Sequence, residues 1–244
     1  RIRGYDAIPP VSLSLDGELP GLAIDLSLQR ARRARRALAQ RGMVEAVTWS
    51  FMPSGRAAGF RAEDAAALPL ANPISADLDE MRPSILPNLL AAAARNAARG
   101  HGDIALFEVG PQYADATPEG QSRVAAGVIA GLARPRHWTA KARPADAFDA
   151  KAAALAALDA AGAPVDKLQI TTDAPGWYHP GRSGVFRLGP NILAAFGEIH
   201  PRTLREMELR GGAAGFEVFL DAVPVPRSKD SGKARPLLRP SPFQ

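Results

Sequence analysis

The segment Trp177–Phe186, with the sequence WYHPGRSGVF, collects residue types that take part in catalysis and binding. His179 could serve as a general base, Ser183 as a nucleophile and the glycines as a phosphate-holding turn. General-base chemistry needs an orienting carboxylate and a nucleophile within reach, and no nearby pattern supplies both. Ser183 also lacks the small-residue elbow that exposes a hydrolase serine. A structural or subunit-interface role is therefore favoured for His179 and Arg182, with Pro180 and the following glycine forming a turn.

Other candidate sites carry weaker signals. The chain contains neither a GxGxxG nor a Walker pattern, so no phosphate cradle is indicated. Its 4 histidines lack metal-ligand spacing and there is no cysteine, which argues against a zinc site. Asp77, Asp79 and Glu80 form an acidic cluster that could bind Mg²⁺. Exposed loop acids are the favoured interpretation of that cluster, and no metal-binding residue is predicted.

Composition is that of a globular protein, with 46% hydrophobic and 23% charged residues among 244. No apolar run is long enough to cross a bilayer, and the lack of cysteine favours a cytoplasmic location. The chain begins with Arg1 and shows no signal-peptide pattern, so we expect an internal fragment of a longer protein. The net charge of +5 arises largely from the stretch QRARRARRALAQRG, which predicts a basic helix facing solvent or another subunit.

Periodicity and turn residues predict several strands joined by tight turns, with helices inserted among them rather than alternating one for one. The expected helices cover residues 26–41, 84–100, 146–162 and 201–209. The expected strands cover residues 43–51, 103–113, 123–133, 166–172, 184–189, 191–199 and 214–223. Consecutive strands joined by tight turns indicate an α+β fold whose antiparallel sheet has helices on one side.

Three separated stretches carry a family resemblance. RIRGYDAIPP, LANPISADLDEMRPSILPNLLAAAARN and FGEIHPRTL resemble, in this order, the β subunit of bacterial phenylalanyl-tRNA synthetases. The resemblance divides the chain into three parts. Residues 1–25 would be a connector from an upstream winged-helix-like domain, 26–225 a catalytic-like module, and 226–244 a linker toward a ferredoxin-like anticodon-binding domain.

The resemblance implies a class II aminoacyl-tRNA synthetase-like fold, an antiparallel β-sheet flanked by helices. In this family the α subunit performs the chemistry, and the β module is a related copy that has lost it. The implied holoenzyme is an α2β2 heterotetramer that uses ATP and Mg²⁺ to attach phenylalanine to tRNA(Phe) in the cytoplasm. Its tRNA contacts, metal-binding carboxylates and editing site are expected mainly in other domains, and this fragment is expected to hold no cofactor.

The loss of catalysis can be tested on individual residues. Amino-acid activation needs cations at the reacting phosphate, and class II enzymes use two arginines. The resemblance aligns Ala114 and Ala222 with those arginines, and it places Glu217 and Phe219 where glycines would open the nucleotide site. The sequence therefore predicts no catalytic residue. An autonomous adenylate-forming or acyl-transfer enzyme remains the alternative, with phosphate-binding arginines drawn from a set of three: Arg82, Arg182 and Arg187.

The remaining expectation concerns partners. The basic helix occupies the place where class II proteins build their dimer face, so Arg32, Arg33 and Arg36 are candidates for contact with the α subunit. Trp49, like Phe51 and Phe60, could lie in the core or at an interface, with the core favoured for aromatic residues in strands. The candidate interface set is Arg32, Arg33, Arg36, Trp49, His179 and Arg182. A basic RNA-binding module, built on this helix and on residues 134–143, is a second alternative and would bind less tightly as salt rises.

Overall fold

The computed structural model describes residues 4–10, 24–62 and 65–225. The linker expected over residues 226–244 lies outside the described residues, as does most of the connector expected over residues 1–25. The described part of that connector contains a short 3-10 helix, Tyr5–Ala7. None of the helices in the described ranges has the length and apolar content that crossing a bilayer would require.

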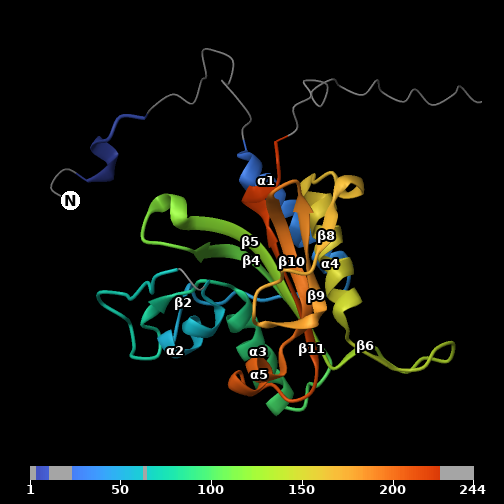
Figure 1. The fold of residues 1–244 in the computed structure, drawn as a ribbon. Helices are drawn as coiled ribbons and strands as arrows, with labels where there is room; N and C mark the ends of the chain where they lie inside the picture. The colour runs from blue at the N-terminus through green and yellow to red at the C-terminus, as the bar shows by residue number, and fades with distance from the viewer. Residues whose placement is uncertain (1–3, 11–23, 63–64, 226–244) are drawn as a thin grey trace, which may run out of the picture.

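Within the described residues, a seven-stranded sheet forms the centre of the molecule (Figure 1). In spatial order its strands are β1 (Val44–Glu45), β4 (Ile104–Tyr113), β5 (Gln121–Ala130), β11 (Ala213–Phe219), β10 (Asn191–Ile199), β9 (Tyr178–Leu188) and β8 (Gln169–Thr171). The pairing of β1 with β4 is parallel, and all other neighbours in this sheet are antiparallel. The α+β fold class is therefore confirmed.

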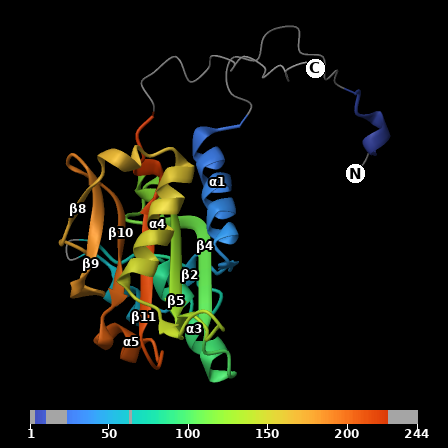
Figure 2. The same cartoon turned by 90° about the vertical axis from the view of Figure 1, so that its right-hand side faces the viewer.

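Helices cover both faces of the sheet, so the expectation of helices on one side is wrong (Figures 1 and 2). One face packs against α1 (Leu26–Gln40) and α4 (Ala147–Ala161), and the other against α3 (Leu86–Ala98) and α5 (Pro201–Glu206). The physical reason is visible in the β5 sequence VAAGVIA, whose small and apolar residues point alternately to both faces. A strand that is apolar on both sides must be covered on both sides.

The helices begin and end where local signals place them. Asp146 and Asp149 form a capping box at the start of α4, and Gly162 ends that helix with a φ of 89°. The Ser84 hydroxyl accepts a hydrogen bond from the Leu86 N–H at 3.0 Å, just before the first turn of α3. Pro87 lies in that first turn, where its missing N–H costs no hydrogen bond.

The prediction of one continuous strand over residues 43–51 is wrong, because the middle of this segment is not in a strand. Only Val44–Glu45 joins the sheet, and Phe51–Met52 forms β2, which pairs with β3 (Glu80–Met81) in a separate two-stranded ladder. The intervening segment continues from β1 without a ladder partner of its own. Side chains from elsewhere in the fold satisfy part of its backbone, as described below, and a sequence pattern does not show such partners.

The turn expected at Pro180 is also wrong, because β9 runs through it. Pairing with β10 joins Gly197 to Ser183 and Ile199 to Tyr178, so β9 has extra residues at this point and bulges from the ladder. The Ser183 hydroxyl donates to the His179 carbonyl at 2.7 Å. Local side-chain hydrogen bonds of this kind replace ladder bonds that the bulge leaves unmade.

The strand expected over residues 123–133 divides at Gly131, which adopts a φ of 74°. The chain then forms β6 (Leu132–Arg134), which pairs with β7 (Arg143–Pro144) to make a small hairpin. Gly131 suits this position because glycine reaches positive φ without a steric penalty.

A short helix, α2 (Ser54–Ala57), packs against β3 of the β2–β3 ladder.

Candidate functional site

A small cavity of about 210 Å³ lies at the residues expected to differ from an active class II enzyme. Ala114, Glu217 and Phe219 all line it, together with Trp177 and Ser84. Ala114 follows β4, and Glu217 and Phe219 lie on β11, so two central strands of the sheet form part of its wall. The sequence prediction thus located a real cavity and named three of its lining residues.

Glu217 forms part of the wall of this cavity and is 2% exposed. Its Oε1 accepts a hydrogen bond from the Ser84 hydroxyl at 2.5 Å. Its Oε2 accepts from Trp177 Nε1 and from the Tyr178 hydroxyl, both at 3.1 Å. Burial raises the pKa of the Glu217 carboxyl, and the three hydrogen bonds oppose that rise only in part. The group contributes no positive charge to the cavity.

The three arginines that an autonomous enzyme would need all have carboxylate partners. Arg82 is 1% exposed and donates from Nη1 to Glu108 Oε1 at 2.8 Å. Arg182 Nη1 lies 2.7 Å from Glu198 Oε2, and the Arg187 guanidinium pairs with the Asp173 carboxylate. None of these arginines is among the residues that line the small cavity.

One arginine does line the small cavity. Arg61 pairs with Glu80, a carboxylate that is 3% exposed. The expectation that Glu80 is an exposed loop acid is therefore wrong. Asp79 accepts hydrogen bonds from the Ser54 N–H at 2.8 Å and the Ser54 hydroxyl at 2.9 Å. With two of its three carboxylates engaged by protein groups, the acidic cluster does not fit a Mg²⁺ site.

The residue that precedes the position aligned with the second phosphate-binding arginine has a structural role. Asp221, next to Ala222, accepts a hydrogen bond from the Ser27 hydroxyl at 2.9 Å. Its other oxygen accepts from the Arg123 N–H at 2.7 Å. This carboxylate connects the start of α1 to β5, and it does not face the small cavity.

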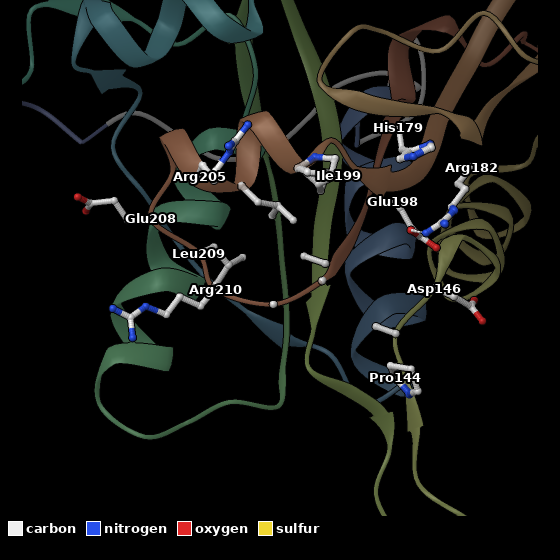
Figure 3. Close-up of a pocket in the computed structure, with 16 residues that line it drawn as sticks. Pro144, Asp146, His179, Arg182, Glu198, Ile199, Arg205, Glu208, Leu209 and Arg210 are labelled. Atoms are coloured by element: carbon white, nitrogen blue, oxygen red, sulfur yellow. Dashed lines mark hydrogen bonds and ion pairs between the residues drawn. The ribbon is translucent and has the colours of Figure 1, made fainter.

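His179 and Arg182 line a different and larger groove, of about 1310 Å³ (Figure 3). Figure 3 shows them on one side of this groove, with Arg205 and Arg210 on the other. His179 Nδ1 accepts a hydrogen bond from the Gly181 N–H at 3.1 Å, and Ser183 donates to the His179 carbonyl rather than to its ring. No base–nucleophile pair is formed, which favours the structural interpretation of this segment.

Helix α1 divides its arginines between packing and solvent. Arg30 is buried and donates to the Leu220 carbonyl at 3.2 Å and to the Pro224 carbonyl at 2.9 Å. Arg35 pairs with Glu45 at 2.7 Å, which joins the helix to β1. The candidate interface residues of this helix are exposed; they are Arg32, Arg33 and Arg36.

Beside the helix, the chain exposes three large apolar side chains. Val44 is 63% exposed, Val47 91% and Trp49 65%, and the Trp49 ring stacks on Phe51 with centroids 5.9 Å apart. The core interpretation is wrong for Trp49, whereas Phe60 is buried as expected. We use the name helix-loop surface for the exposed arginines of α1 together with the exposed apolar residues that follow the helix in the chain: Arg32, Arg33, Arg36, Val44, Val47 and Trp49.

A network of side chains fixes the loop that carries Val47 and Trp49. Thr48 donates from its N–H and its hydroxyl to Glu108 Oε2, at 3.2 and 2.6 Å. Asn88 Nδ2 donates to the Trp49 carbonyl at 2.7 Å, and Arg82 Nη1 donates to Thr48 Oγ1 at 3.0 Å. A loop held in this way loses little further conformational entropy when a partner covers it.

Sequence reasoning missed this network. The available signal was a charged residue, Glu108, inside the otherwise apolar strand sequence ALFEVG. A buried charge needs a partner, which pointed to an arginine elsewhere in the chain.

The six candidate interface residues do not form one surface. Arg32, Arg33 and Arg36 are exposed on α1, and Trp49 is exposed in the segment between β1 and β2. His179 and Arg182 lie on β9, separated from β1 by four strands. His179 and Arg182 instead line the groove of Figure 3.

Comparison with known proteins decides the family. The model of the phenylalanyl tRNA synthetase beta chain CLM domain matches residues 16–220. The chain belongs to this family. The phenylalanine–tRNA ligase beta subunit of Rhodospirillum rubrum is 54% identical over the whole chain, and that of Brucella suis is 51% identical. The chain spans 30% and 31% of the length of these two relatives.

Solved structures support the fold of this CLM-family chain. A pyrrolysyl tRNA synthetase from Desulfitobacterium hafniense superposes with a TM-score of 0.61 at 18% identity, covering 80% of this chain and 64% of that one. A second structure of the enzyme from the same organism gives 0.60 at 19% identity, covering 81% and 67%. The expectation of a class II synthetase-like fold is therefore confirmed.

Proposed function

We propose that this chain is a non-catalytic structural module within a phenylalanine–tRNA ligase beta chain. It supports an alpha subunit that uses ATP and Mg²⁺ to attach phenylalanine to tRNA(Phe) in the cytoplasm, in an α2β2 assembly. Residues 1–25 and 226–244 connect it to a winged-helix-like and a ferredoxin-like domain, and those other domains make most contacts with tRNA(Phe). The observation that carries this proposal is the buried carboxyl of Glu217 in a cavity whose lining arginine is already paired.

Electrostatics argues against amino-acid activation at this cavity. The reaction develops negative charge on phosphate, and a catalyst must place cations beside it. Arg61 lines the cavity and Arg82 lies outside its lining, and binding phosphate would require either one to leave its carboxylate partner. Removing one partner of a buried ion pair costs about 3–5 kcal/mol. The volume of about 210 Å³ is also below the roughly 300–1,000 Å³ of typical ligand pockets.

The helix-loop surface supports the assembly part of the proposal. It combines a large exposed aromatic side chain with arginines, the residue types that contribute most to protein interfaces. Its loop is already ordered by Glu108, Asn88 and Arg82. Its three exposed arginines favour a partner that presents acidic residues opposite α1.

The assembly is tested by charge reversal in the full-length beta chain, co-expressed with the alpha subunit. We expect Arg32→Glu with Arg33→Glu to reduce co-purification of alpha several-fold, because two attractive contacts become repulsive. The matched control is Arg99→Glu with Arg202→Glu, which reverses two exposed arginines, one directly after α3 and one in α5. Equal recovery of alpha with both double variants would contradict the proposed interface.

The absence of catalysis is tested by separate binding measurements on the chain. We expect association with the alpha subunit and no binding of ATP at micromolar concentrations by calorimetry. Micromolar ATP binding would favour the autonomous enzyme, and a structure with nucleotide held by guanidinium groups beside Glu217 would establish it.

A further inference from the structure

The β6–β7 hairpin, residues 132–144, projects from the end of the sheet beside α4 (Figure 1). We call it the basic hairpin. Trp138 lies in its loop and is 90% exposed, and among the described residues its one aromatic neighbour is the His137 ring, 5.6 Å away between centroids. Burying such a ring is worth several kcal/mol, so a tryptophan in water at a projecting tip is well placed to bind a partner.

The charges of this hairpin are all of one sign. Arg134, Arg136 and Lys141 are exposed, and residues 131–144 contain no acidic residue. Within the described part of the chain, no carboxylate lies within ion-pair distance of these three cations. Their charge is therefore available to an external anion.

The base of the hairpin is fixed even though its tip is exposed. Arg143 Nη1 lies 2.9 Å from Asp146 Oδ2, and Arg143 Nη2 lies 2.6 Å from Asp149 Oδ1. The Ala145 N–H donates to the Gly131 carbonyl at 2.9 Å. These bonds join the hairpin to the capping box of α4, so its position relative to the sheet is defined before any partner binds.

Further arginines line two grooves beside the hairpin. The groove of Figure 3 begins at Pro144, the last residue of the hairpin, and its opposite wall carries Arg205 and Arg210. Arg210 also lines a neighbouring groove of about 700 Å³, together with Arg56 and Arg95. Glu208 is the one acidic residue that lines this second groove. The second groove therefore has an excess of positive charge, whereas the groove of Figure 3 carries Asp146, Glu198 and Glu208 beside its three arginines.

We propose that the basic hairpin binds single-stranded RNA. The Trp138 indole stacks on an unpaired base, Arg134, Arg136 and Lys141 contact the phosphates on either side, and the strand continues toward Arg210. Proteins that bind single strands combine these elements, because every base offers a face for stacking and the backbone is uniformly anionic. Base-paired RNA hides these faces, so the site requires an unpaired segment.

The surroundings of Trp138 favour RNA over an acidic protein. The centres of protein interfaces are rich in apolar residues and depleted in charge. Here the neighbours of the indole in the loop are cations, His137, Thr139 and Ala140, with no second large apolar side chain among residues 134–143. One aromatic ring with cations on both sides in the sequence is complementary to a polymer in which each base lies between phosphates. The inference stands on this hairpin and does not depend on the proposed assembly with alpha.

The test uses the full-length beta chain in complex with alpha, and RNA of about 15 nucleotides that contains 4-thiouridine. Irradiation followed by tryptic digestion and mass spectrometry is expected to find crosslinks in the peptide His137–Lys141. Trp138→Ala should abolish these crosslinks, while Phe148→Ala, which removes another highly exposed aromatic ring nearby, should leave them unchanged. No crosslink in this peptide, or an equal yield from Trp138→Ala, would overturn the proposal.

Affinity measurements complete the test. We expect Trp138→Ala to weaken binding to the single strand about five-fold or more, the effect of losing one stacked base. The double variant Arg136→Ala with Lys141→Ala should lower the slope of log affinity against log salt by about 1.4, unlike Arg99→Ala with Lys167→Ala. Equal affinity for duplex RNA would overturn stacking on an unpaired base. Poly-glutamate binding that matches RNA binding and survives Trp138→Ala would indicate an acidic protein instead.

Discussion

Glu217 shows how one side chain can exclude an activity and support a fold. Its carboxyl accepts hydrogen bonds from Ser84, Trp177 and Tyr178, so it joins the segment before α3 to two strands of the sheet. Because burial raises its pKa, the folded chain holds the Glu217 proton more tightly than the unfolded chain does. Protonation of Glu217 therefore stabilises the folded state.

This linkage predicts a pH-dependent difference between wild type and Glu217→Gln. The stabilisation is fully present below the unfolded pKa and is lost as pH rises through the raised folded pKa. The free energy of unfolding of wild type should therefore fall relative to that of Glu217→Gln as the pH rises above about 4. Denaturation with urea across this range measures it. Glu119→Gln, an exposed control, should show no such trend, and a flat difference for Glu217→Gln would refute the raised pKa.

At this scale the sequence identified the residues but not their partners. Glu217, Phe219 and Ala114 were named from the resemblance and do line one cavity. Ser84, which donates to Glu217, lies 133 residues away in the chain, and Arg82 finds Glu108 from a separate segment. Side-chain partners at such separations follow from tertiary packing, which local periodicity does not encode.

Among the elements, α4 carries the clearest local signals. Asp146 accepts hydrogen bonds from the N–H groups of Phe148 and Asp149, which would otherwise have no partner at the helix start. The same carboxylate pairs with Arg143, so it also fixes the basic hairpin.

Asp146→Ala should therefore lower the free energy of unfolding by about 1 kcal/mol. The control is Asp159→Ala in the last turn of α4, where a negative charge opposes the helix dipole and its removal should be neutral or slightly stabilising. Urea denaturation at neutral pH compares them. Equal stability of the two variants would mean that the cap contributes nothing.

Helices were predicted better than strands for a physical reason. Asp146 and Gly162 determine the ends of α4 through contacts with residues only a few positions away in the chain. The bounds of this helix were therefore predicted closely from sequence. Segment 43–51 has strand-like composition and segment 178–183 has turn-like composition, yet the pairing of both depends on distant partners and on bulges. Hydrophobic alternation predicted Val47 and Trp49 in a strand, whereas side chains of Glu108 and Asn88 hold them in an exposed loop.

At the scale of the whole molecule, the two proposed contact surfaces lie apart. The helix-loop surface is at the β1 edge, and the basic hairpin follows β5 and projects beyond the end of the sheet (Figure 1). The sequence assigned the basic helix and residues 134–143 to one alternative, RNA binding. Their placement on different parts of the fold separates them into two predictions.

Independence of the two surfaces is measurable. Arg136→Ala with Lys141→Ala should leave co-purification of alpha unchanged, because the substituted residues are distant from α1. The two hairpin substitutions can also be combined with Arg32→Glu and Arg33→Glu in one variant. This variant should reduce co-purification of alpha as much as Arg32→Glu with Arg33→Glu does alone, because the effects of sites without shared partners are additive. A larger loss in the combined variant, measured by the same co-expression assay, would show that the surfaces are coupled.

The lengths of the outermost strands have a further consequence. The sheet ends in β1, two residues long, and in β8, three residues long. Such brief margins offer few free N–H and C=O groups on which another chain could add a strand, and this guards against sheet-to-sheet aggregation. A newly synthesised beta chain can thus expose Val44, Val47 and Trp49 to solvent before it assembles, without polymerising through the edges of its sheet.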